Sequence, residues 1–188
     1  MNTILIILVI GIIVIAAIAT WGYVQNRRSK ALSSRFGPEY QHAVSEYGSR
    51  SRAERALERR AERAEKYQIR SLKPEEQQRF SEEWRIAQAR FVDDPALAIR
   101  EADHLVCEVM RQRGYPVSDF EQRAEDLSVD HPLVVRNYRA AHSVALMEKE
   151  GKATTEDLRK AMVSYRELFD ELLEAHAQTR AILTERRG

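Results

Sequence analysis

The sequence predicts an all-α protein: an N-terminal transmembrane helix, a long charged helix and then a compact bundle of about five helices. Apolar residues recur at helical spacing in several segments, and the last of these is the clearest: Leu158, Met162, Tyr165, Phe169 and Leu172. No segment alternates apolar and polar residues with the period of two that strands have, and no two-residue hairpin turn is present. Most of the few glycines and prolines fall where helices are expected to begin or end.

Residues 4–24 contain no charged side chain and predict the membrane anchor, to which we assign residues 1–25. Twenty-one residues at a rise of ~1.5 Å make ~31 Å of helix, which matches the ~30 Å hydrocarbon core of a bilayer. Trp21 and Tyr23 lie where an interfacial aromatic belt is expected. The basic residues that follow belong to residues 26–38, which we interpret as a basic juxtamembrane linker. The residues expected at the membrane surface are Trp21, Tyr23, Arg27, Arg28, Lys30 and Arg35.

A cleaved signal peptide is the alternative interpretation of the N-terminus, because residues 17–19, Ala-Ile-Ala, resemble a small-x-small cleavage site. The three residues before the apolar run include no Lys or Arg, and the first charges after the run are all positive. By the positive-inside bias the helical domain is expected in the cytoplasm and the N-terminus outside. The opposite orientation and a cleaved, exported protein remain the alternatives.

The charge of the soluble part is unevenly distributed. Residues 25–66 hold 11 Lys/Arg and 6 Glu, whereas residues 67–188 hold 19 Lys/Arg and 23 Asp/Glu. We expect one charged amphipathic helix over residues 39–70, weakened by Gly48, acting as a solvent-exposed spacer or a coiled-coil arm. A nucleic-acid partner is not expected, because glutamates interleave its arginines and repel phosphate.

The bundle is expected over residues 71–180, followed by a frayed tail over residues 181–188. Its first helix begins at Pro74 and carries an aromatic stripe that predicts core: Phe80, Trp84, Ala87 and Phe91. The next helix has Asp94 as its N-cap and stops at Gly114. Ser118 and Glu121 predict a capping box for a short helix that ends near Leu127. Two further helices are predicted, one from Pro132 to Gly151 and one capped by Thr154–Asp157.

No catalytic motif is present: the sequence has no phosphate loop, no glycine-rich nucleotide turn and no His-Glu-x-x-His. His104 and Cys107 have a spacing that suits two metal ligands, but no partner cluster completes a site, so Cys107 is better explained as a small buried side chain. Asp130 and His131 are interpreted as capping and turn residues at a helix start. No cofactor is expected, and a single cysteine excludes an internal disulfide.

Several segments of the soluble region resemble an uncharacterised group of bacterial membrane-anchored helical proteins. They are Arg35-Phe36-Gly37-Pro38-Glu39-Tyr40, Arg90-Phe91-Val92-Asp93-Asp94-Pro95, Arg113-Gly114-Tyr115-Pro116-Val117, Leu127-Ser128-Val129-Asp130-His131-Pro132 and Thr154-Thr155-Glu156-Asp157-Leu158-Arg159. The resemblance implies a bacterial origin and an N-terminal hydrophobic segment, and it carries no functional residue.

The leading functional hypothesis is a membrane-tethered interaction or scaffold module without chemistry of its own, bound to lipids by the anchor and to an unidentified protein partner. The second hypothesis is an enzyme whose residues meet only in the fold. A deep pocket that joins His104, His131 or His142 to buried carboxylates would favour the enzyme.

Overall fold

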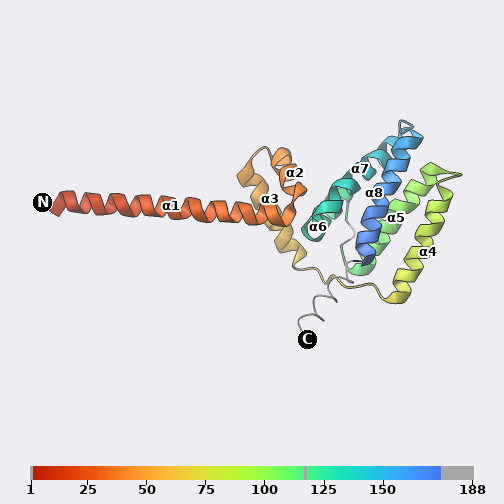
Figure 1. Cartoon of the computed structure of the whole chain (residues 1–188), viewed down its shortest axis with the longest axis horizontal. Helices are drawn as coiled ribbons and strands as arrows, with labels where there is room; N and C mark the ends of the chain where they lie inside the picture. The colour runs from red at the N-terminus through yellow and green to blue at the C-terminus, as the bar shows by residue number, and fades with distance from the viewer. Residues whose placement is uncertain (1, 117, 175–188) are drawn as a thin grey trace. The chain divides into compact units, whose positions relative to one another are not determined.

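A computed structural model describes residues 2–116 and 118–174, with side chains described from Ile10 onward. These residues form eight helices and no strand, which confirms the predicted all-α class (Figure 1). The chain divides into two compact units, Met1–Glu58 and Arg59–Gly188, and the boundary falls inside the third helix.

The first unit begins with α1 (Asn2–Phe36), a single helix that includes most of the expected linker over residues 26–38. The expected linker is therefore helical over residues 26–36. Residues 26–36 contain neither glycine nor proline, so nothing stops the helix before Gly37, where φ is +48°. The helical continuation also buries Ser29, Leu32 and Phe36 on one face.

The expected single helix over residues 39–70 is instead two shorter helices, α2 (Pro38–Tyr47) and α3 (Arg50–Ala64). Gly48 ends α2 in the left-handed conformation with φ of +61°, so it breaks the helix where only a weakening was expected. Residues 68–73 are not helical. The spacer interpretation also fails for α3, because Ala53, Glu54 and Leu57 are buried.

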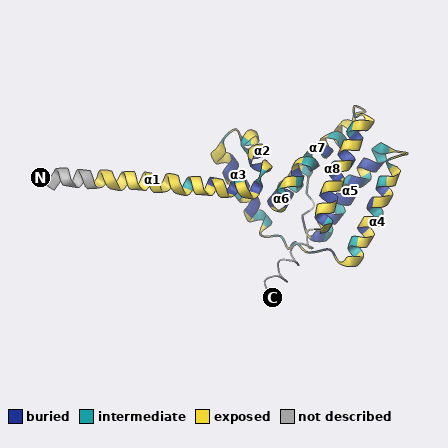
Figure 2. Ribbon diagram, in the orientation of Figure 1, coloured by how far each residue is buried: buried dark blue, intermediate teal, exposed yellow. Residues whose placement is uncertain are grey.

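The second unit contains a helical bundle built from α4 (Pro74–Arg90), α5 (Pro95–Arg113), α6 (Phe120–Asp130), α7 (Pro132–Lys149) and α8 (Thr155–Glu174). Helix α8 packs against α5 and α7, while α4 packs against α5. Within this unit, buried residues follow one side of α5 and α8, whereas exposed residues follow the other (Figure 2).

The predicted stripes form the core of this bundle. Phe80, Trp84 and Ala87 are buried, and Phe91 is partly buried against them. All five residues of the α8 stripe are buried, and the rings of Trp84 and Phe169 stack with their centroids 4.6 Å apart. Burial of aromatic rings of this size accounts for much of the stability of a small domain.

Most helix ends lie where capping chemistry predicts them. Asp94 accepts a hydrogen bond from the backbone of Leu97, Gly114 adopts φ of +97°, and Thr154 and Asp157 cap α8. The N-cap predicted at Ser118 was wrong by one residue, because Asp119 accepts from the Gln122 backbone at 2.9 Å. Helix α6 also continues to Asp130, three residues beyond its expected end. The tail predicted over residues 181–188 lies outside the described residues.

Candidate functional site

The residues expected at the membrane surface all lie on α1 and are exposed: Trp21, Tyr23, Arg27, Arg28, Lys30 and Arg35. Arg28 forms an ion pair with Glu58, and the Arg35 guanidinium lies 5.9 Å from the centre of the Phe36 ring. Arg27 and Lys30 make no hydrogen bond or ion pair with any other described residue. Two of the four basic side chains are therefore free to meet an outside charge.

The apolar residues of α1 that precede this basic segment are exposed on every side of the helix. They are Ile10, Ile12, Ile13, Val14, Ile15, Ile18 and Val24, each at least half exposed. Helix rotation of 100° per residue places consecutive members such as Ile12 to Ile15 all around the axis. The first unit therefore carries apolar side chains that its own described residues do not cover.

A buried polar network joins the three helices of the first unit. The Glu54 carboxylate accepts hydrogen bonds from the Ser29 hydroxyl and, at 2.8 Å, from the Tyr40 hydroxyl. Arg50 Nε donates to the same carboxylate at 3.1 Å and to Tyr40 at 2.9 Å. Burial alone would raise the pKa of Glu54, but these three donors together lower it, so the carboxylate is charged at neutral pH.

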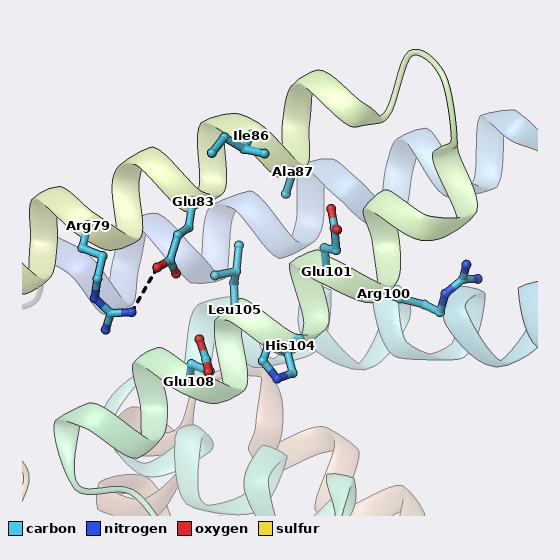
Figure 3. Close-up of a pocket in the computed structure, with 9 residues that line it drawn as sticks. All are labelled: Arg79, Glu83, Ile86, Ala87, Arg100, Glu101, His104, Leu105 and Glu108. Atoms are coloured by element: carbon cyan, nitrogen blue, oxygen red, sulfur yellow. Dashed lines mark hydrogen bonds and ion pairs between the residues drawn. The ribbon is translucent and has the colours of Figure 1, made fainter.

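A groove of about 530 Å³ lies between α4 and α5 in the second unit (Figure 3). Its lining residues are Arg79, Glu83, Ile86, Ala87, Arg100, Glu101, His104, Leu105 and Glu108.

The charges in this α4–α5 groove are only partly paired. Arg79 contacts Glu83 at 3.0 Å and Arg100 contacts Glu148 at 3.2 Å, whereas His104 and Glu108 have no such partner among the described residues. The exposed His104 imidazole and the half-buried Glu108 carboxylate can accept a basic side chain beside the apolar Ile86.

The three histidines named in the enzyme hypothesis have different surroundings. His104 is exposed in the α4–α5 groove, while His131 is buried with Nδ1 3.0 Å from a carboxylate oxygen of Glu171. The His142 ring stacks on Phe120 with centroids 3.6 Å apart. The three histidines thus do not share one site, and no group of three His, Cys, Asp or Glu side chains suited to a metal ion occurs among the described residues.

Cys107 lies beside a cluster of polar side chains in the bundle rather than in a fully apolar site. The Tyr165 hydroxyl donates to Asp103 at 3.1 Å, and Arg123 Nε lies 3.4 Å from the Tyr138 hydroxyl. Burial, followed by the nearby Asp103 charge, raises the pKa of the Cys107 thiol. The thiol is therefore protonated at neutral pH and is a weak nucleophile.

A second ionic network, absent from the sequence interpretation, holds the end of α3 to α6. Arg63 donates to Asp126 at 2.9 Å and to Glu125 at 2.8 Å, and Arg60 donates to Glu125 at 2.9 Å. Tyr67 donates to the other Asp126 oxygen at 3.2 Å. The partners are about sixty residues apart in the chain, so no local sequence pattern pairs them.

Comparison with known proteins adds no family to this description. No protein-family model matches the chain, and no curated protein or solved structure is significantly similar to it. A search of the described residues for helices with the length and hydropathy of a membrane span found none.

Proposed function

We propose that this protein is a membrane-tethered helical interaction module, in which α1 is the anchor and the bundle binds a protein partner. The observation that carries the proposal is the set of exposed apolar side chains on α1, among them Ile15 at 69% and Ile18 at 64% exposure. Seven aliphatic residues in this state would gain on the order of 10 kcal/mol on transfer to hydrocarbon.

The proposed anchor is the full charge-free run of the sequence, residues 4–24. The structure describes the side chains of this run only from Ile10 onward. The search for membrane spans was limited to described residues, whereas the proposed anchor includes the whole run. A helix that is apolar on all sides is typical of a membrane span, whereas a water-soluble helix keeps a polar face.

The proposed orientation places the N-terminus outside and the residues after Val24 in the cytoplasm. It follows from the four basic residues that come directly after the apolar run: Arg27, Arg28, Lys30 and Arg35. Cytoplasmic leaflets are usually anionic, and each basic residue near such a surface contributes about 1 kcal/mol of attraction.

Support for a binding role, rather than catalysis, comes from the open α4–α5 groove and its unpaired Glu108. A partner with a basic side chain next to an apolar one would match Glu108 and Ile86. Partners should be identified by purifying the intact protein from its native membrane, in parallel with a Glu108→Lys variant. A partner that binds both forms equally does not use this groove.

The anchor is tested by alkaline carbonate extraction of membranes from cells that express the intact chain. We expect the chain to stay in the membrane pellet and the Ile12→Arg/Ile13→Arg double variant to be released, since each central arginine costs about 2.5–3.5 kcal/mol on insertion.

The matched control is Val92→Arg, because Val92 is 85% exposed on the bundle and should tolerate charge. Release of the unmodified chain by carbonate would refute the anchor. A mature protein that begins at Thr20 would instead establish signal cleavage and export.

A further inference from the structure

A groove of about 340 Å³ lies between α1 and the start of α3 in the first unit. Its lining residues are Trp21, Gly22, Gln25, Asn26, Ser29, Arg50, Ser51 and Glu54. The α1 residues among them recur at helical spacing and so form one stripe of that helix. We call this feature the α1–α3 groove; it is separate from the α4–α5 groove of the bundle.

The α1–α3 groove begins at the aromatic residue that marks the expected edge of the bilayer. From Trp21 to Ser29 the helix rises about 12 Å. The headgroup region on each side of a bilayer is about 5–8 Å thick, so a helix that leaves the hydrocarbon near Trp21 passes its Gln25 and Asn26 through that region. The position of the groove therefore follows from the anchor proposed above.

The groove offers a cation that is held in place but not neutralised completely. Arg50 uses only Nε in its bonds to Tyr40 and Glu54, and 62% of its side chain is exposed. Its two terminal nitrogens have no partner among the described residues. Glu54, the acidic member of the lining, already accepts from Ser29, Tyr40 and Arg50, and these hydrogen bonds spread its charge.

Three polar side chains accompany Arg50 in the lining of the groove. Gln25, Asn26 and Ser51 line the groove and make no hydrogen bond with other described residues. The charged residues that line the groove are thus Arg50 and Glu54, and the terminal nitrogens of Arg50 are the charged donors that have no partner among the described residues.

We propose that the α1–α3 groove binds the phosphate of an anionic phospholipid headgroup, with Arg50 as its charged ligand and Gln25, Asn26 and Ser51 as hydrogen-bond donors. This inference rests on the proposed function, because only a membrane anchor brings the groove to the headgroups. A guanidinium that is already held by two hydrogen bonds loses little freedom on binding a phosphate, and its paired donors suit the phosphate oxygens.

The test measures lipid selectivity for the full chain reconstituted in phosphatidylcholine vesicles. Spin-labelled phosphatidylglycerol and spin-labelled phosphatidylcholine are compared by electron paramagnetic resonance, which reports the fraction of each lipid held at the protein. We expect a preference for phosphatidylglycerol that falls about fivefold in Arg50→Gln, the equivalent of about 1 kcal/mol for one basic residue at the surface.

Two further variants separate the groove from general charge and from misfolding. Arg55→Gln removes an exposed α3 cation that does not line the groove and should keep the preference. Ser51→Glu places a negative charge in the groove without removing any hydrogen bond from the Glu54 network, and it should abolish the preference while helical circular dichroism stays unchanged.

The possible failures have different signatures. An unchanged preference in both Arg50→Gln and Ser51→Glu overturns the headgroup site but leaves the anchor standing. Displacement of the labelled lipid by excess glycerol 3-phosphate assigns the groove to soluble phosphates and overturns the lipid assignment. A chain that does not remain with the vesicles refutes the anchor, and the headgroup site with it.

Discussion

Helices α1 and α8 are both rich in apolar residues, but they place those residues in opposite ways. In α8 the apolar side chains recur at helical spacing and are buried against α5 and α7. In α1 they occupy consecutive positions and are exposed on all sides. The spacing of the apolar residues, more than their number, therefore decides whether a helix can bury them against other helices of the same chain.

The largest expected effect comes from truncating the core of the bundle. Phe169→Ala removes a ring that is 1% exposed and stacked on Trp84, so the free energy of unfolding should fall by about 3–5 kcal/mol. Urea unfolding of the intact chain in detergent, followed by linear extrapolation, measures this change.

The matched change in α1 is Ile18→Ala, which should alter the unfolding of the bundle by less than about 0.5 kcal/mol, because Ile18 is exposed. A comparable loss in both variants would show that Ile18 is covered by the protein itself, and the contrast between α1 and α8 would not hold.

Sequence reasoning located the core stripes because each depends on one helix alone. Trp84 and Phe169 were both assigned to the core from the spacing of their neighbours, and both are buried. The end of α1 was missed because the charges over residues 26–36 suggested a linker, although no helix-breaking residue precedes Gly37. Composition describes the solvent that a segment prefers, whereas glycine and proline mark where a helix can end.

The polar networks could not be predicted from the sequence, for a different reason. Ser29 and Glu54 are twenty-five residues apart, and Arg63 and Asp126 are sixty-three apart. Each pair depends on how the helices pack. The chain contains many other Arg and Glu residues, and the sequence does not distinguish which of them form ion pairs. Among the residues that we propose to contact lipid, the sequence named those on α1 but not Arg50, which lies beside α1 only because α3 packs there.

The second prediction compares the buried carboxylates of the two units. Glu54 has three donors and a lowered pKa, whereas burial raises the pKa of Asp126 even though Arg63 and Tyr67 donate to it. Arg63→Met should therefore destabilise the bundle by about 3 kcal/mol, the low end for a broken buried pair, because Arg63 is itself one-third exposed.

The Arg63→Met variant should also respond to acid in a specific way. A folded carboxyl with a raised pKa binds its proton more readily than the unfolded one, so stability increases as the pH falls through the folded pKa. The variant should recover part of its loss as the pH is lowered from neutral, as measured by urea unfolding at each pH. If the loss is independent of pH, Asp126 is not the group left unpaired.

The third prediction concerns the start of α6, where local chemistry sets a helix end. Asp119→Ala removes the carboxylate that accepts from the Gln122 backbone and should cost about 1 kcal/mol. Ser118→Ala should cost less than about 0.5 kcal/mol, because the Ser118 hydroxyl caps nothing in α6. Urea unfolding of both variants distinguishes the two positions, and a larger loss for Ser118→Ala would restore the cap predicted from the sequence.

The smallest expected effect is the acid response of His142. Burial lowers the pKa of this imidazole, as does the nearby Arg123, and the opposing Asp103 charge does not compensate. The unfolded chain therefore protonates His142 near its ordinary pKa of about 6.5 while the folded chain resists, so stability is lost as the pH falls below that value. Because the ring is only partly buried, its desolvation is incomplete and the loss is modest.

His142→Phe isolates this contribution, because it keeps an aromatic ring against Phe120 and cannot titrate. Urea unfolding between about pH 7.5 and pH 5.5 should give a shallower loss for the variant than for the unmodified protein. Carboxyl groups with a lowered pKa, such as Glu54, affect stability only below about pH 4.5. Asp126, whose pKa is raised, stabilises the fold as the pH falls and so cannot cause the loss. If stability falls equally steeply with pH in the two proteins, the His142 imidazole is protonated as easily in the folded chain as in water. Packing against the Phe120 ring would then not desolvate it.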